Sequence, residues 1–251
     1  MKEALIPGWV YVWSTPLSAA AVELETILDE TETRRYQSYR KQEDRKRALL
    51  SFGLLRLLLS HFLQKPPEEI QISRECPQCH KPHGKPRVLE EHPLEVNISH
   101  SGDWVLTALT RDYPIGIDIE KKVSGDYWKE LINLVLSAKE RKEWEKFSDP
   151  EKTVAFFQYW TQKEAILKAT GDGLTVPMTD LTISRNAGIP RLTAWRGQEE
   201  KVARIQCYPL KIDSGYEACL AVMGDCRKIC LRDGKHIIEA WLKKHPEKFA
   251  R

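Results

Sequence analysis

The chain has 251 residues, enough for one large domain or two modest ones. With 41% hydrophobic and 30% charged residues it is too apolar to be disordered, and 39 basic against 36 acidic residues is far from the excess expected of a nucleic-acid-binding protein. No apolar run reaches the roughly 18–20 residues that a membrane span needs. We therefore expect a globular protein that binds neither nucleic acid nor membrane.

The expected compartment is the cytoplasm. The N-terminal residues include Pro7 and Trp9 and lack the apolar stretch of a signal peptide. Six cysteines in a chain of this length do not make a disulfide scaffold. The cysteines are therefore expected to be reduced thiols.

The first part of the chain predicts helical material followed by short strands. Residues 5–13 are β-branched and aromatic, which predicts an opening strand, and a helix is expected from Pro16. Residues 31–63 have a strongly helical pattern whose second part is apolar almost all round, so a buried helix is expected there, ending before Pro66. Short strands are expected at 70–72, 95–99 and 104–110.

A break at 112–114 separates this part from a second series of elements. A strand is expected at 115–120, then helices from about 127 to 169 that are interrupted at 148–150, with Gly171 as a C-terminal stop. The similar order on both sides of the break suggests two related halves packed about a shared cleft. The remaining elements are strands at 181–184, 191–195, 203–208 and 217–222, and an amphipathic segment in the tail that includes Ile237, Ile238, Trp241 and Leu242.

The segment Gly116–Glu120 places two carboxylates on one side of a strand. Side chains alternate along a strand, so Asp118 and Glu120 point to one face and the intervening isoleucines to the other. Two carboxylates on a covered face need a cation or water between them. Metal binding is one interpretation, and the solvated acidic face of an edge strand is the alternative.

A third carboxylate stands in the helix predicted before Gly171. Glu164 and Lys168 are four residues apart and therefore share a helix face, either as an ordinary ion pair or as residues of a cleft. The apolar neighbours Trp160 and Ile166 favour the cleft. Together with Asp118, Glu164 would belong to a set of hard oxygen ligands suited to Mg²⁺, which binds few carboxylates together with substrate phosphates.

Two other segments have residues that suit an anionic ligand. His100 and Ser99 lie at a strand end beside Gly102, where exposed amides and hydroxyls favour a phosphate contact, although a single turn histidine is usually structural or solvated. Basic residues are dense between Arg34 and Arg47, and Lys85 follows later. Most such runs are solvated helix faces, but a cation that faces a cleft would bind a phosphorylated ligand.

Taken in order, these segments resemble the motifs of the Sfp-type 4′-phosphopantetheinyl transferases. That family carries Gly-Lys-Pro, then Asn-x-Ser-His-Ser, then Gly-Ile-Asp-x-Glu, then Trp-x-x-Lys-Glu-Ala-x-x-Lys. Each motif is loose by itself, but four in this order are specific, and the resemblance runs from about Arg34 to Pro177. The motifs stand here at Gly84–Pro86, Asn97–Ser101, Gly116–Glu120 and Trp160–Lys168.

The resemblance implies an α+β fold of the pseudo-dimeric 4′-phosphopantetheinyl transferase kind, with two similar α+β halves and the active site in the cleft between them. The N-terminal half would be 1–112, with the residues that bind the coenzyme phosphates. The C-terminal half would be 113–225, with the metal ligands and the catalytic helix, and 226–251 would be a partly helical tail. The smaller holo-carrier-synthase relatives are about half as long and trimerise, so this length favours the Sfp type and a monomer.

The resemblance also implies a reaction. Phosphopantetheine would pass from coenzyme A to a serine of an apo acyl- or peptidyl-carrier protein with the help of Mg²⁺, and adenosine 3′,5′-bisphosphate would leave. The implied metal ligands are Asp118, Glu120 and Glu164, with Glu164 also taking the serine proton, directly or through a water, and Lys168 assisting the leaving phosphate. The residues implied to bind the coenzyme are Arg47, Lys85, Ser99, His100, Lys163 and Lys168, with Arg40 less securely placed.

The sequence leaves several alternatives open. Cys76, Cys79, His80 and His83 have zinc-knuckle spacing without a second ligand pair, so an ordered turn that presents Lys85 is the competing interpretation. The rival functions are a zinc-knuckle or nucleic-acid-binding module and a Mg²⁺-dependent phosphohydrolase. The pathway of the carrier is also open, whether fatty acid, polyketide or nonribosomal peptide synthesis, as is the role of the tail after Asp225. The carrier surface is expected to consist of exposed apolar residues between the Asp118 strand and the Glu164 helix, with Tyr127 and Trp128 as candidates.

Overall fold

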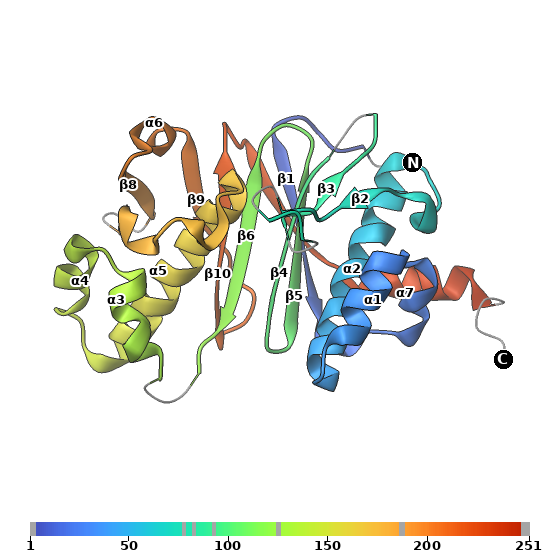
Figure 1. The fold of residues 1–251 in the computed structure, drawn as a ribbon, viewed down its shortest axis with the longest axis horizontal. Coiled ribbons are helices and arrows are strands. Elements are labelled where there is room, and N and C mark those ends of the chain that lie inside the picture. The colour runs from blue at the N-terminus through green and yellow to red at the C-terminus, as the bar shows by residue number, and fades with distance from the viewer. Residues whose placement is uncertain are drawn as a thin grey trace. The chain divides into compact units, whose positions relative to one another are not determined.

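A computed structural model describes residues 4–76, 79–81, 84–91, 94–123, 127–185 and 189–246. The chain folds into two compact α+β units (Figure 1). The first unit comprises Met1–Asp112 together with Arg227–Arg251, and the second comprises Tyr113–Cys226. The tail therefore belongs to the first unit and does not form a separate part of the molecule, because its strand completes that unit's sheet.

The first unit is built on a four-stranded sheet in the order β11-β1-β5-β4. Strand β1 pairs in parallel with β11 and antiparallel with β5, and β5 pairs antiparallel with β4. Strands β4 and β5 lie close to their predicted ranges, β1 begins four residues and ends three residues later than the predicted strand at 5–13, and β11 was missed. The strands are β1 (Trp9–Pro16), β4 (Glu95–Ser101), β5 (Trp104–Thr110) and β11 (Lys228–Asp233).

A long helix supplies most of the core of the first unit. Helix α2 (Gln42–Leu63) is buried continuously from Ala48 to Leu59, which confirms the expected buried helix. Residues after Pro16 form short 3₁₀ turns, where the sequence predicted an α-helix. The other elements are η1 (Leu17–Ala19), η2 (Val22–Ile27), α1 (Glu30–Ser38), η3 (Pro67–Glu69), β2 (Ile72–Ser73), β3 (Arg87–Val88) and α7 (Lys235–Lys244).

A buried arginine ties α1 to α2 in this unit. The Arg56 side chain is 0% exposed, and it forms ion pairs with Glu32 and with Asp29, the residue that caps α1. Its Nη1 also donates to the carbonyl oxygens of Pro67 at 2.8 Å and Ile70 at 3.1 Å. Because the planar guanidinium matches carboxylates and carbonyls at once, one side chain holds three segments of the chain together.

Replacing Arg56 with methionine is therefore expected to destabilise the protein strongly. The substitution leaves the buried Glu32 carboxylate with only Arg74, whose Nη2 lies 3.4 Å away, and leaves Asp29 without its partner, which together should cost about 3 kcal/mol. Denaturant unfolding measures the loss. As the control, Arg34→Met removes the exposed pair with Glu30 and should cost less than about 0.5 kcal/mol. Equal losses in the two variants would contradict a structural role for the buried network.

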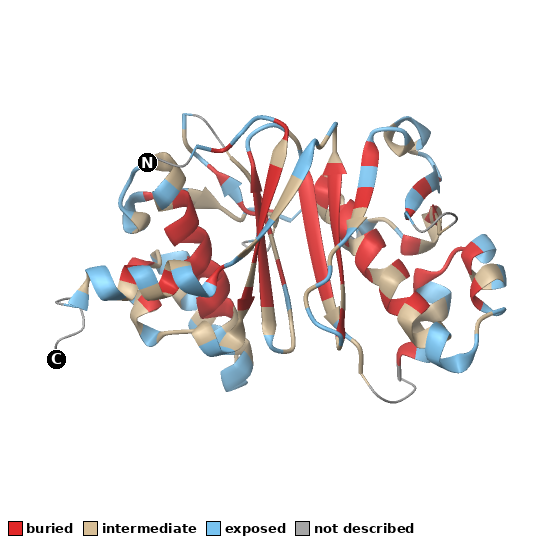
Figure 2. Ribbon diagram, turned by 180° about the vertical axis from the view of Figure 1, so that it is seen from behind, coloured by how far each residue is buried: buried red, intermediate tan, exposed pale blue. Residues whose placement is uncertain are grey.

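The second unit combines a three-stranded sheet with a second long helix. Helix α5 (Asp149–Thr170) packs against β6 (Ile115–Lys121) and β10 (Tyr216–Met223), and the sheet has the order β6-β10-β9. A capping box at Ser148 starts the helix, and Gly171, with φ of 79°, ends it as predicted. In each unit the buried residues follow the sheet and the face of the long helix packed on it (Figure 2).

Shorter elements complete the second unit. Strands β7 and β8 form a separate hairpin and match their predicted ranges. None of the described helices is long and apolar enough to cross a membrane. The remaining elements are η4 (Tyr127–Leu131), α3 (Ile132–Val135), α4 (Ala138–Trp144), η5 (Gly173–Thr175), η6 (Met178–Asp180), β7 (Leu181–Ser184), β8 (Arg191–Trp195), α6 (Glu199–Val202) and β9 (Ile205–Pro209).

Candidate active site

Helix α5 lies directly on strand β6 because Gly116 has no side chain. A Cβ at this position would stand 2.0 Å from the carbonyl oxygen of Ala165 and 2.4 Å from the amide nitrogen of Ala169. Both atoms belong to the helix backbone, so no side chain could move away to make room. Gly116 therefore brings the middle of α5 against the strand that carries the paired carboxylates.

The carboxylates of β6 point toward this helix. Asp118 and Glu120 share the face of Gly116, since side chains two residues apart lie on the same side of a strand. Asp118 is 2% exposed and Glu120 is half-buried. The Nζ of Lys168 on α5 donates to Asp118 Oδ1 at 2.6 Å and to the Ile117 carbonyl oxygen at 3.3 Å. The strand and the helix are thus joined by a partly buried ion pair.

The charges of this cluster act on one another. Burial lowers the pKa of Lys168, but Asp118, Glu164 and Glu120 together outweigh that effect, so the pKa is raised above its ordinary value. The pKa of Glu164 is also raised, first by burial and also by Asp118, against the opposing effect of Lys168. Three carboxylates and one ammonium therefore share one electrostatic environment, which is the combination expected to handle phosphate and a divalent cation.

Carboxylate oxygens are the donors that Mg²⁺ prefers, so the chemistry of this cluster fits that ion. Within the described parts of the chain, no three acidic, histidine or cysteine side chains are arranged to hold a metal ion as they stand. In this arrangement the Asp118 carboxylate is instead engaged by Lys168. The ligand set Asp118, Glu120 and Glu164 stays a prediction.

Sequence reasoning missed a fourth carboxylate beside this cluster. Glu217 on β10 lies directly opposite Glu120 in the antiparallel register, so both share a face of the sheet. Its carboxylate accepts hydrogen bonds from Lys122 Nζ at 3.0 Å and Gln158 Nε2 at 3.1 Å. Only the strand register places Glu217 here, and a single sequence does not contain that information.

The position of Lys163 argues against the predicted contact with the coenzyme. Its side chain is 0% exposed, and its ammonium donates to the carbonyl oxygens of Val135 and Met178 and to the Glu140 carboxylate. These bonds use all three ammonium protons. Lys163 is therefore a residue of the interior of the second unit, although the motif places it next to Glu164.

In the first unit, α2 holds the hairpin that carries His100. Arg47 donates from Nη1 to the Gly102 carbonyl oxygen at 2.8 Å and from Nη2 to Asp44 Oδ1 at 2.6 Å. The hydrogen bond with Arg47 is the main cause of a lowered pKa for Asp44, to which His100 also contributes. Two residues that the resemblance assigns to the coenzyme, Arg47 and His100, therefore lie in one neighbourhood. Ser99, the third residue of this group, is 7% exposed on β4.

Lys85 follows a segment in which some of the described residues are joined by backbone hydrogen bonds. The Cys76 amide donates to the Lys81 carbonyl oxygen at 2.9 Å, and the His80 amide donates to the Cys76 carbonyl oxygen at 2.8 Å. Lys85 Nζ bonds Glu95 Oε2 at 3.1 Å. These contacts join described residues of a segment whose residues 77–78 and 82–83 lie outside the described parts of the chain. Of the residues with zinc-knuckle spacing, His83 lies outside the described residues. Arg40 is exposed between α1 and α2.

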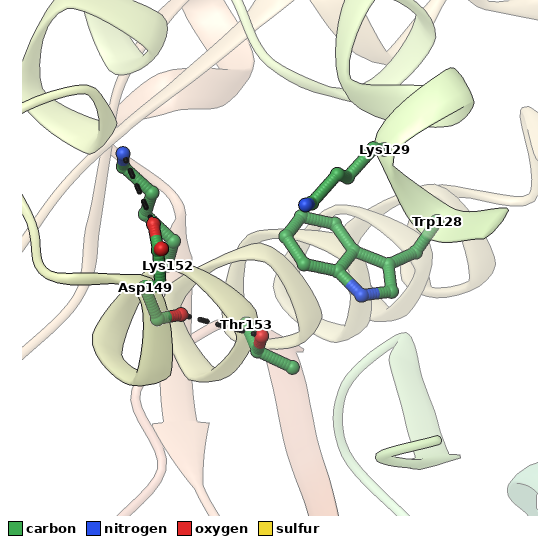
Figure 3. Close-up of a pocket in the computed structure, with 5 residues that line it drawn as sticks. All are labelled: Trp128, Lys129, Asp149, Lys152 and Thr153. Atoms are coloured by element: carbon green, nitrogen blue, oxygen red, sulfur yellow. Dashed lines mark hydrogen bonds and ion pairs between the residues drawn. The ribbon is translucent and has the colours of Figure 1, made fainter. Parts of the chain in front are cut away.

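A hollow of about 210 Å³ lies near the start of α5 (Figure 3). Trp128 is 3% exposed and its ring centroid lies 5.1 Å from that of Phe156, so the expectation of an exposed carrier contact at Trp128 is wrong. The side chain of Tyr127 lies outside the described residues. Among the described residues of this region, Leu134 is exposed, at 66%. The hollow is lined by Trp128, Lys129, Asp149, Lys152 and Thr153.

Both halves of the chain resemble known proteins. Residues 114–221 match the family model described as the 4′-phosphopantetheinyl transferase superfamily, and residues 12–111 match the one described as 4′-phosphopantetheinyl transferase, N-terminal. The chain is 31% identical to the 4′-phosphopantetheinyl transferase HetI of Nostoc sp., over 68% of this chain and 72% of that protein. It is 30% identical to the 4′-phosphopantetheinyl transferase Sfp of Bacillus subtilis, over 57% of this chain and 59% of that protein.

A solved structure gives a further likeness. The holo-ACP-synthase of Plasmodium yoelii is 25% identical to the chain, with a TM-score of 0.34, and the match covers 43% of this chain and 91% of that one. The matched region thus covers 72% of the length of HetI but only 59% of the length of Sfp.

Proposed function

The chain belongs to the 4′-phosphopantetheinyl transferase family, and we propose that it transfers 4′-phosphopantetheine from coenzyme A to a serine of an apo carrier protein. Adenosine 3′,5′-bisphosphate is the second product. The observation that supports this proposal best is the cluster of Asp118, Glu120, Glu164 and Lys168 at the contact of β6 with α5. Carboxylates beside an ammonium in a partly buried site suit the transfer of a group between a hydroxyl and a pyrophosphate.

The proposed metal ligands are Asp118, Glu120 and Glu164, and the proposed ion is Mg²⁺. When bound, such an ion neutralises charge on the pyrophosphate oxygens and aligns the phosphate under attack. The raised pKa of Lys168 supports this assignment, because it reflects a concentration of negative charge that a cation relieves. The Asp118 carboxylate would exchange its bond to Lys168 for the metal.

Two side chains handle protons in the proposed reaction. The hydroxyl of the carrier serine loses its proton to the Glu164 carboxylate, directly or through a water, as its oxygen attacks the β-phosphorus of coenzyme A. The bond from that phosphorus to the bridging oxygen breaks, and the Lys168 ammonium stabilises or protonates the oxygen that leaves. The electrostatic interaction of Glu164 with Asp118 and Lys168 supports its place beside the reacting groups.

The phosphates of coenzyme A are proposed to bind residues of the first unit. Arg47, Lys85, Ser99 and His100 are the candidates, by resemblance. The bond from Arg47 to Gly102 supports a common role for Arg47 and His100, because it fixes the hairpin turn next to the histidine. Lys163 is left out of this set, since its ammonium is fully engaged in the interior.

Mass spectrometry of the carrier after incubation distinguishes the proposed transferase from the alternative functions. The protein is mixed with coenzyme A, Mg²⁺ and an apo carrier, and transfer adds about 340 Da to the carrier. Release of phosphopantetheine without a carrier adduct would support a Mg²⁺-dependent phosphohydrolase instead. Absence of both products, together with binding of nucleic acid, would support the zinc-knuckle or nucleic-acid-binding module.

Further proposals concern the setting of the enzyme. We propose that it acts as a monomer in the cytoplasm, where its six cysteines stay reduced. Its partner is proposed to be an acyl- or peptidyl-carrier protein of fatty acid, polyketide or nonribosomal peptide synthesis. The mass-shift assay run with one apo carrier of each kind would identify the pathway by the carrier modified fastest.

Replacing Lys168 with methionine is expected to lower kcat about a hundredfold while the KM for coenzyme A changes less than about threefold. The reason is that the proposed contact of Lys168 strengthens as charge develops on the leaving oxygen. Steady-state kinetics over a range of coenzyme A concentrations measures both constants. Lys201→Met is a matched control, because Lys201 also forms a partly exposed pair with an aspartate, Asp172, and should keep wild-type kinetics. A rise in KM alone for Lys168→Met would show that the lysine only binds substrate.

A further inference from the structure

A fully buried ion pair stands directly beside Glu164. Lys163 Nζ lies 2.5 Å from Glu140 Oε2, 2.6 Å from the Val135 carbonyl oxygen and 3.0 Å from the Met178 carbonyl oxygen. Both side chains of the pair are 0% exposed. The lysine thus connects α5 to the end of α3, to α4 and to η6 at a single atom.

The Glu140 carboxylate of the pair also accepts hydrogen bonds from backbone amides. Glu140 Oε1 accepts a hydrogen bond from the Ile183 amide of β7, and Oε2 accepts one from the Ser137 amide, both at 2.7 Å. The Ser137 hydroxyl is in turn bonded by Thr182 at 3.1 Å. All three ammonium protons and both carboxylate oxygens are therefore engaged, and a shift of the lysine would break several hydrogen bonds at once.

Helix α5 is held on both sides of Glu164. The Lys163–Glu140 pair fixes it before Glu164, and the contact with β6 fixes it after Glu164. Lys163 precedes Glu164 by one residue, and Ala165, which follows by one, lies against Gly116. Since successive residues of a helix point about 100° apart, fixing both neighbours fixes the direction in which Glu164 points. A rotation of the helix about its axis would move Glu164 away from Asp118 and Glu120.

We propose that Lys163 and Glu140 are positioning residues that aim Glu164 at the carboxylates of β6. In this proposal the pair contacts neither the coenzyme nor the carrier. Its effect is to set the rotation of α5, and hence the geometry of the proposed metal ligands and of the proposed base. The inference rests on the proposed function for its consequence in turnover, but its consequence for metal binding can be measured separately.

The test compares two isosteric variants of the full-length protein, Glu140→Gln and Glu32→Gln. Each removes the charge of a buried carboxylate that is paired with a buried cation, Lys163 in the second unit and Arg56 in the first. Mn²⁺ binding, followed by the EPR signal of the free ion, is measured together with kcat and with thermal unfolding. Glu164→Gln is included to show that the Mn²⁺ signal reports the proposed ligand.

Both isosteric variants should unfold at lower temperature, but only Glu140→Gln should bind Mn²⁺ about tenfold more weakly and lose about tenfold or more in kcat. Its KM for coenzyme A should stay within about twofold of the wild type, because the variant disturbs the orientation of Glu164 and removes no contact with the coenzyme. If folded Glu140→Gln matches Glu32→Gln in Mn²⁺ affinity and kcat, the pair is merely structural and the inference is overturned.

A milder variant covers the case in which Glu140→Gln does not fold. Ser137→Ala removes the hydroxyl that accepts from the Glu140 amide and is expected to cost only about 1 kcal/mol, as for other helix caps. It should weaken Mn²⁺ binding about threefold, and wild-type affinity would overturn the inference. Wild-type protein that neither binds Mn²⁺ nor modifies a carrier would instead overturn the proposed function, and this inference with it.

Discussion

Replacing Gly116 with alanine is expected to destabilise the protein by about 3 kcal/mol or more and to lower kcat at least about a hundredfold. The added methyl group would stand 2.0 Å from the Ala165 carbonyl oxygen, so α5 must move away from β6 or the strand must bend. Either movement separates Glu164 and Lys168 from Asp118. Denaturant unfolding and the carrier mass-shift assay measure the two effects.

Gly215→Ala is a suitable control for this experiment. Gly215 also lies in the second unit, just before β10, but a Cβ there meets only the Asp213 side chain, at 3.3 Å. Stability and activity should therefore stay near the wild type. A Gly116→Ala variant with the same properties as this control would show that the close contact of strand and helix is not needed.

The sequence predicts the parts of the fold that depend on short-range patterns. The predicted ranges of β6, β7 and β8 agree with the structure to within about one residue, and the continuous apolar run located the buried part of α2. These elements are specified by their own residues, because each must bury one face or all of its surface.

Long-range pairings are what the sequence leaves undetermined. Strand β11 pairs in parallel with β1, more than two hundred positions earlier in the chain, and its residues lack a clear alternation of burial. The turns of η1 and η2 show a similar limit, because apolar spacing alone does not separate a 3₁₀ helix from an α-helix. Pairing of distant segments depends on the rest of the fold, which a local pattern does not contain.

The candidate site shows the same division. The motifs located Asp118 and Lys168, and the structure joins them through an ion pair. The motif that contains Lys163 could not distinguish a ligand contact from a buried structural bond, because both need a lysine at that position. Glu217 could not be predicted, because only the pairing of β10 with β6 shows that it lies opposite Glu120.

Replacing Asp118 with asparagine is expected to lower kcat/KM about a thousandfold while the protein stays folded. Asparagine has nearly the same shape and can still accept a hydrogen bond from Lys168, so no cavity forms and the lysine keeps a partner. The lost charge removes one proposed metal ligand, and Mn²⁺ binding should weaken in parallel. Activity is measured by the mass shift of the carrier, and folding by circular dichroism and thermal unfolding.

Glu217→Gln separates a specific effect of Asp118 from a general loss of negative charge. Glu217 lies on the same face of the same sheet, but its carboxylate is bonded to Lys122 and Gln158 rather than to the catalytic candidates. Its replacement should leave kcat/KM within about threefold of the wild type, as expected for a residue that makes no contact with the transition state. Unfolding of Asp118→Asn would assign Asp118 a structural role, and equal activity losses in the two variants would mean that the charge of the whole face matters rather than a ligand at Asp118.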